Sequence, residues 1–136
     1  MIRRGPRGEN GQALVEFALV LPFLLAFALA IALMTEIGVA RLALEHAAAE
    51  GARIGALTND DDEIRVAAFA AVAPIDASTV TVRIEPGELD APRDHDPRGT
   101  ILRVTLAHRV PVPLGFAGLP ELAIEAEAAR VMEWTP

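Results

Sequence analysis

Cysteine, lysine and tyrosine are absent from this 136-residue sequence, and tryptophan and serine each occur once. The lack of cysteine excludes disulfides, thiolate zinc sites and a cysteine nucleophile, so stability must come from packing or from partners. Acidic residues number 19 against 12 arginines, which gives a formal charge of −7. Because binding to a polyanion requires a positively charged surface, we expect no nucleic-acid partner.

Sequence patterns for catalysis are also lacking. No G-x-S-x-G motif surrounds the single serine, Ser78, and the sequence contains no P-loop, no G-x-G-x-x-G and no H-E-x-x-H. A chain of this length forms one small domain, which excludes a large enzyme with a deep cleft. We therefore expect no enzymatic activity, no cofactor and no metal site.

The sequence does contain one long apolar run. Phe17 to Met34 has no charged or hydrogen-bonding side chain, and a helix of that length is about 27 Å long, nearly the thickness of a bilayer core. Pro22 lies inside the run and is expected to kink the helix, a defect that membrane helices tolerate when neighbours cover the freed carbonyl. We predict a transmembrane helix that packs against other helices.

The residues before this run predict its orientation. Residues 1–11 contain three arginines and one glutamate. The positive-inside rule therefore places the N-terminus in the cytoplasm and the rest of the chain outside. A secretory signal peptide is the alternative, because small residues alternate over residues 26–32. Against it, the apolar run continues to Met34 and a carboxylate, Glu16, separates the basic and apolar regions.

The segment GQALVEFALVLP, from Gly11 to Pro22, resembles the processing site of type IV pilin-like proteins, most closely that of the TadE-like proteins of tight-adherence (Tad, or Flp) pilus systems. In that family a prepilin peptidase cuts after a glycine at the cytoplasmic face, and a glutamate beside an aromatic residue stands fifth in the mature chain. The resemblance implies cleavage between Gly11 and Gln12, with Glu16 fifth and Phe17 sixth. Gln12 stands where many pilins have Phe or Met.

The same resemblance implies a function and its partners. The chain would be a minor pilin or pseudopilin that helps a Tad-like pilus or secretion system assemble, without catalysis. Its partners would be the membrane, other pilin-like subunits, the prepilin peptidase and the Tad assembly platform. It would cross the inner membrane once or enter an extracellular pilus. The alternatives are an uncut single-pass protein that presents a small binding domain, and a secreted binding protein or small hydrolase cleaved from a signal peptide.

Glu16 has a physical meaning without the resemblance. A carboxylate at the edge of an apolar span costs roughly 2.5 kcal/mol or more if it is drawn to the bilayer centre, so it requires a cation there. Cleavage after Gly11 would create an α-amino group one helical turn away, on the same chain or on a neighbour. The alternative is an interfacial glutamate that stays hydrated.

The helical pattern continues beyond the membrane span. Residues 37–57 keep apolar or small side chains at spacings of three and four, which predicts an amphipathic helix. Ala47, Gly51 and Gly55 form a row of small residues. This row either admits another helix or a sheet at close range, or reflects a helix end that tolerates glycine. Thr58-Asn59-Asp60 then predicts a helix stop and a new N-cap.

A second, short helix is expected to run to about Ala73, before Pro74. Its acidic start, Asp61 to Glu63, is favoured by the positive end of the helix dipole. A calcium loop is the alternative for this acidic run, but the alternating spacing and the distal glutamate of such loops are missing.

From Ser78 onward the hydrophobic period is two, which predicts three strands at about residues 79–85, 101–110 and 122–129. One face of such a sheet is apolar, and the two preceding helices are the candidates to cover it. We predict a pilin-like α+β fold, in which helices pack on a small antiparallel sheet. Its parts are a basic leader at 1–11, a transmembrane helix at 12–35, an amphipathic helix at 36–57 and an extracytoplasmic head at 58–136.

Histidines and loops supply the remaining candidate sites. His46 and Glu50, four apart on a helix, could share a metal, but an exposed polar pair is the favoured interpretation because a third ligand is missing. His108 is interpreted as a core or rim histidine. The loop Pro86–Gly99 could cup a divalent ion, yet we interpret it as a solvated loop beside Arg93 and Arg98; its candidate ligands are Asp90, Asp94, His95 and Asp96. The apolar loop that carries Leu114, Phe116 and Leu119 is expected to plug the end of the sheet rather than to contact another subunit.

Overall fold

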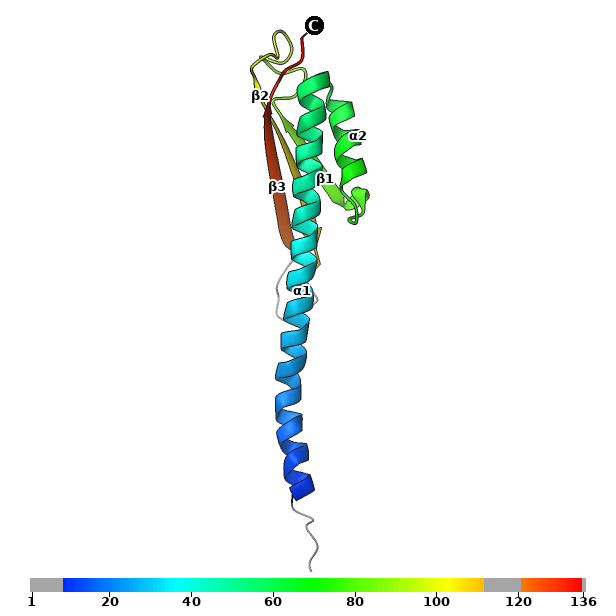
Figure 1. The fold of residues 1–136 in the computed structure, drawn as a ribbon, viewed down its shortest axis with the longest axis vertical. Helices are drawn as coiled ribbons and strands as arrows, with labels where there is room; N and C mark the ends of the chain where they lie inside the picture. The colour runs from blue at the N-terminus through cyan, green and yellow to red at the C-terminus, as the bar shows by residue number, and fades with distance from the viewer. Residues whose placement is uncertain (1–8, 112–120, 136) are drawn as a thin grey trace, which may run out of the picture. The chain divides into compact units, whose positions relative to one another are not determined.

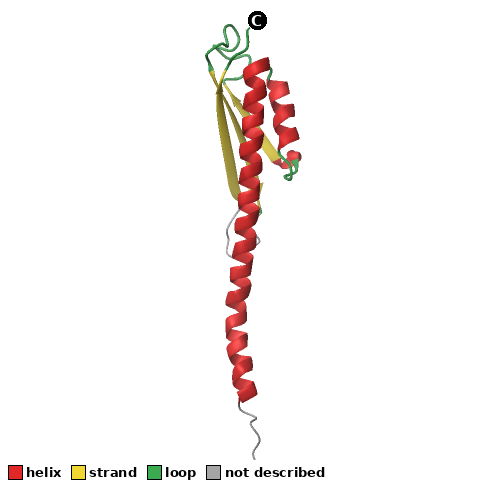
Figure 2. Cartoon of the chain, viewed as in Figure 1, coloured by secondary structure: helices red, strands yellow, loops and turns green. Residues whose placement is uncertain are grey.

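The structure is a computed structural model that describes residues 9–111 and 121–135. Its elements are, in chain order, α1 (Glu9–Thr58), α2 (Asp61–Ala71), a short 3-10 helix (Ala77–Thr79), β1 (Val80–Glu85), β2 (Ile101–Val110) and β3 (Leu122–Val131) (Figures 1 and 2). The predicted α+β fold, with a long apolar N-terminal helix, a second helix and three antiparallel strands, is confirmed. The chain divides into two compact units, Met1–Glu36 and Ile37–Pro136, called below the N-terminal and the C-terminal unit.

The N-terminal unit consists, in its described part, of the apolar half of α1. This helix has 50 residues and stays helical on both sides of Pro22. Within the described ranges it is the one helix that is long and apolar enough to cross a membrane. Its large apolar side chains are exposed, Phe23 and Met34 by 77% each. Lipid or other helices must cover a surface of this kind. Residues 1–8 of the predicted leader lie outside the described residues.

The sheet of the C-terminal unit has the strand order β1-β2-β3, and both pairs of neighbours are antiparallel. Val82 lies opposite Leu106, which in turn lies opposite Ala126. This register brings the inward-facing residues of the three strands onto one face, because side chains alternate along a strand. Most of the link between β2 and β3, including the predicted plug residues 114, 116 and 119, lies outside the described residues.

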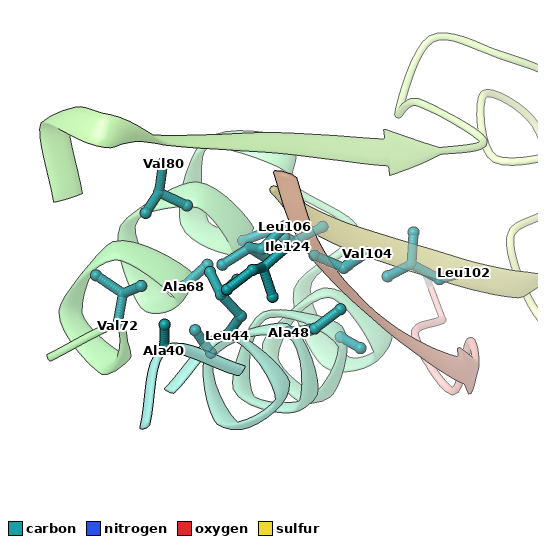
Figure 3. Packing of buried hydrophobic residues seen from close by; sticks show 14 of the residues in the cluster. Ala40, Leu44, Ala48, Ala68, Val72, Val80, Leu102, Val104, Leu106 and Ile124 are labelled. Carbon is teal, nitrogen blue, oxygen red and sulfur yellow. The ribbon is translucent and has the colours of Figure 1, made fainter. Parts of the chain in front are cut away.

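The helices cover the apolar face of this sheet, as the sequence predicts. The C-terminal part of α1 and the shorter α2 lie beside each other against the strands (Figure 1). Small residues on both helices let the helices and the sheet approach closely (Figure 3). The buried cluster comprises Ala40, Leu44, Ala47, Ala48, Ala52, Ile64, Ala68, Val72, Val80, Leu102, Val104, Leu106, Val110, Ile124, Ala126 and Met132.

The row of small residues on α1 faces this core. A Cβ atom added at Gly55 would lie 2.5 Å from side-chain atoms of both Ile64 and Leu102. Glycine at this position is therefore required by close packing against α2 and β2, which decides between the two interpretations of the row. Gly51 has more room, since its added Cβ would lie 3.4 Å from its nearest neighbours.

The turn between α1 and α2 follows the predicted stop signal. Asn59 adopts a left-handed conformation with φ 56°, and its backbone N–H donates to the carbonyl of Gly55, a common way to end a helix. Asp60 is the N-cap of α2, because its side chain accepts from the backbone N–H groups of Asp62 and Glu63. The helix ends at Ala71, two residues before the predicted end.

Candidate processing and assembly site

The four predicted site residues lie in the first described turns of α1. Gly11 has open space around it, since an added Cβ would meet no atom within 4 Å. Gln12 and Glu16 are exposed, and Phe17 is 58% exposed at the start of the apolar run. The four residues therefore lie at one end of the apolar helix, where a peptidase or a neighbouring subunit can reach them.

Gln12 and Glu16 are joined by a hydrogen bond. The Gln12 Nε2 amide donates to Glu16 Oε1 over 3.1 Å. Spacing of four on a helix brings the two side chains together, and this spacing is the signal from which the contact could have been predicted. Sequence reasoning had assigned Gln12 to the cleavage point alone.

No cation of the described chain neutralises Glu16. Among the described residues none of the salt bridges includes it. In the sequence, the 33 residues between Arg7 and Arg41 contain no lysine or arginine. A cationic partner for Glu16 must therefore come from a new chain terminus, another molecule or the leader.

The His46 and Glu50 pair has a structural explanation. Glu50 forms a salt bridge with Arg53, while His46 is exposed. The hydrogen bond from Arg53 lowers the pKa of the Glu50 carboxyl, and the same bond raises the pKa of the Arg53 guanidinium. Across the described part of the chain no three His, Cys, Asp or Glu side chains are arranged to hold a metal ion.

Arg93, in the loop between β1 and β2, is buried, although most of this loop is exposed, as the interpretation of a solvated loop expects. Its Nη1 forms an ion pair with Asp61 Oδ1 over 2.7 Å and also donates to the carbonyl of Pro86. Its Nε donates to Asn59 Oδ1 over 2.9 Å. These contacts fasten the loop to the turn between the two helices. The Asp61 carboxylate therefore does more than interact with the dipole of α2: it is also the ion-pair partner of the buried Arg93.

The acidic side chains of that loop are occupied or exposed. Asp90 Oδ2 accepts from the backbone N–H of Gly87, and Asp94 pairs with His95 over 2.8 Å. Asp96 is exposed. These contacts shape the loop and, within the described ranges, bring no set of metal ligands together.

His108 joins β2 to the short 3-10 helix that precedes β1, at the rim of the core. Its Nδ1 lies 3.1 Å from Thr79 Oγ1, whose hydroxyl in turn donates to the carbonyl of Asp76. Because the hydroxyl hydrogen is used there, His108 serves as the donor in this pair and not as a base for a nucleophile. The uncovered face of the sheet beside it has an open hollow of about 790 Å³, whose floor includes Thr81, Thr105 and Ala107.

Comparison with known proteins identifies the N-terminal helix. The family model of the TadE-like protein matches residues 11–53, a segment that begins at Gly11 and ends within α1. No curated protein and no solved structure matches the chain. The match confirms the resemblance predicted from Gly11 to Pro22. Over residues 11–53 the chain is therefore similar to the TadE-like protein family.

Proposed function

We propose that the protein is a minor pilin or pseudopilin, anchored by α1, that assembles with other pilin-like subunits of a Tad-like system. A prepilin peptidase cuts it between Gly11 and Gln12. The N-terminus then lies at the cytoplasmic face and the C-terminal unit outside the membrane. The observation that carries the proposal is the order of three features: the family match begins at Gly11, Glu16 follows it, and the uncharged run begins directly afterwards at Phe17.

The proposed role of Glu16 is to set the register between subunits. Its carboxylate has no cation on the described part of its own chain, and a membrane environment strengthens its attraction to one. The α-amino group created at Gln12 supplies that cation, on the same chain or on a neighbour. If a subunit packs against its neighbours at the wrong depth, the carboxylate and the amino group are both left without a partner. This unfavourable energy disfavours incorrect registers between subunits.

The exposed apolar surface of α1 supports helix packing as the mode of assembly. Leu14, Phe23 and Met34 are large apolar side chains that are mostly exposed. Lipid or the apolar faces of other helices can cover them. A pilus component is built from such contacts, whereas an enzyme would need a set of reacting groups. The Thr79 and His108 pair, for example, ties the 3-10 helix to β2.

The intact mass of the native protein, purified from membranes, tests the proposal. Loss of residues 1–11 is the expected result. A full-length mass would favour an uncut single-pass protein with a small binding domain. Loss of about 28 to 32 residues, at the small alternating residues of the apolar run, would favour signal-peptide cleavage and secretion.

A substitution at Gly11 tests the cleavage point itself. Gly11→Leu is expected to leave a full-length membrane protein that still carries Met1, because a peptidase site that takes extended backbone requires a small side chain there. Gly38→Leu is the matched control, since Gly38 lies on the same helix and also has no atom within 4 Å of an added Cβ. Normal maturation of Gly11→Leu, measured by intact mass, would contradict the proposed cleavage point.

A further inference from the structure

Gln12 has a chemical property that goes beyond its place at the cleavage point. We propose that it is a modification site: once it is the first residue, its side chain closes onto its own amino group to form pyroglutamate, unless Glu16 holds the amide. This inference rests on the proposed cleavage after Gly11. The structural observation behind it is the hydrogen bond from Gln12 Nε2 to Glu16 Oε1 over 3.1 Å.

The ring closure balances without a co-reactant. The free α-amino nitrogen attacks the side-chain carbon Cδ of Gln12, and a bond between this nitrogen and Cδ forms. The bond between Cδ and Nε2 then breaks, and Nε2 leaves as ammonia with a proton from the amino group. Nothing is oxidised or reduced. The product is a five-membered lactam that carries no charge at the chain terminus.

The hydrogen bond and the ring closure require different side-chain conformations. To reach Glu16, the Gln12 side chain extends one helical turn toward the C-terminus. To close the ring, the same side chain must fold back until Cδ touches the nitrogen of its own residue. The two arrangements exclude each other, so each molecule with the bond intact is protected. A charged acceptor makes this bond stronger than one between neutral groups.

Protection of Gln12 has a consequence for assembly. The α-amino group is the cation that the proposed function assigns to Glu16, and cyclisation removes its charge. By holding the Gln12 amide, Glu16 preserves the charge of its own partner. A pilin-like chain with phenylalanine or methionine at this position has no side-chain amide and faces no such reaction.

The test uses the mature chain, Gln12 to Pro136, so that it does not depend on the prepilin peptidase. Residues 1–11 are replaced by a fusion partner that a site-specific protease removes directly before Gln12, with the protein in detergent micelles. Intact mass is then followed over days at neutral pH for the loss of one ammonia. The samples are the natural sequence, Glu16→Val, Glu16→Gln and Gln12→Met.

Loss of ammonia from Glu16→Val is expected to be roughly twofold faster than from the natural sequence, the factor that corresponds to an exposed hydrogen bond between side chains four apart on a helix. Glu16→Gln keeps an acceptor and should lie between the two, and Gln12→Met should lose none. Equal rates for the natural sequence and Glu16→Val, or no loss from either, would overturn the inference. Such a result leaves the proposed cleavage intact, whereas a full-length mass from native membranes overturns the cleavage alone.

Discussion

At the scale of single residues, two glycines one turn apart on α1 are expected to respond differently to alanine. Gly55→Ala forces a Cβ to within 2.5 Å of Ile64 and Leu102 in a packed core, and overpacking of this kind costs about 1 to 3 kcal/mol. Gly51→Ala brings only ordinary contacts at 3.4 Å and gains helix propensity of about 1 kcal/mol.

Urea unfolding of the C-terminal unit measures both effects. The expected result is a lower midpoint for Gly55→Ala and an unchanged or higher midpoint for Gly51→Ala. Equal midpoints for the two variants would mean that α2 and β2 do not approach α1 as closely as the structure shows.

Arg93 is expected to be a large single contributor to the stability of the C-terminal unit. Arg93→Met leaves Asp61 without its cation in a partly buried position, and breaking a buried ion pair in this way costs about 3 to 5 kcal/mol. The double variant Arg93→Met with Asp61→Leu should recover part of this loss, because it removes the unpaired charge. Unfolding free energies from urea titrations provide the comparison.

Arg98→Met is the matched control for Arg93. Arg98 is exposed in the same loop, so its substitution should change the unfolding free energy by no more than about 0.5 kcal/mol. If Arg93→Met behaved like Arg98→Met, the ion pair would contribute nothing and the loop would be held by other contacts.

The role of Arg93 also shows why sequence reasoning missed part of the head. Arg93 and Asp61 are separated by 32 positions, and the loop that carries Arg93 has no hydrophobic period to indicate which side chains turn inward. The Gln12 and Glu16 contact, by contrast, lies within one helical turn. Local helix spacing predicts contacts such as that between Gln12 and Glu16, whereas contacts such as that between Arg93 and Asp61 depend on the folded arrangement.

At the scale of elements, periodicity predicted most of the fold. The change from a helical period to a period of two located the sheet, and the limits of β2 agree with the prediction at both ends. The end of α2 differs, because the residue before a proline avoids the helical conformation and Ala73 precedes Pro74. The helix therefore ends at Ala71, before Ala73 and Pro74.

The dependence of the sheet on its helices can be tested by truncation. A chain that begins at Glu36 should be soluble and fold into a mixed α/β structure, because it lacks the apolar helix and keeps both covering helices. A chain that begins at Ala77 should aggregate or stay unfolded, because it exposes the face that includes Leu102, Val104 and Leu106, all fully buried in the structure. Circular dichroism of the two chains decides. Equal folding would contradict the packing of helices on the sheet.

At the scale of the whole molecule, the distribution of charge limits how α1 can assemble. No arginine or lysine lies between Arg7 and Arg41, so a cut after Gly11 leaves the new amino group as the cation of the apolar segment. The family match covers the same segment and ends at Arg53. Local features of one helix thus predicted the similarity to the TadE-like family over residues 11–53, whereas partner subunits are selected by surfaces that no short motif encodes.

The strongest test of the assembly mechanism is Glu16→Val. The variant should insert into membranes at least as well as the natural protein, because it removes a group that costs roughly 2 to 3 kcal/mol at depth. Cleavage should persist, since Gly11 is unchanged. Incorporation should fail, because an amino group that is desolvated without its carboxylate carries a penalty of several kcal/mol. Glu16→Asp should be intermediate, as it keeps the charge and shortens the reach.

The measurement is co-purification of each variant with pilin-like subunits from membranes that hold equal amounts of inserted, cleaved protein. Only molecules whose intact mass shows an open amino terminus should be scored, because a cyclised Gln12 carries no charge and would hide the penalty. Incorporation of open-terminus Glu16→Val at the level of the natural protein would show that the carboxylate is a hydrated interfacial residue. Register would then have to come from the apolar packing of α1 itself.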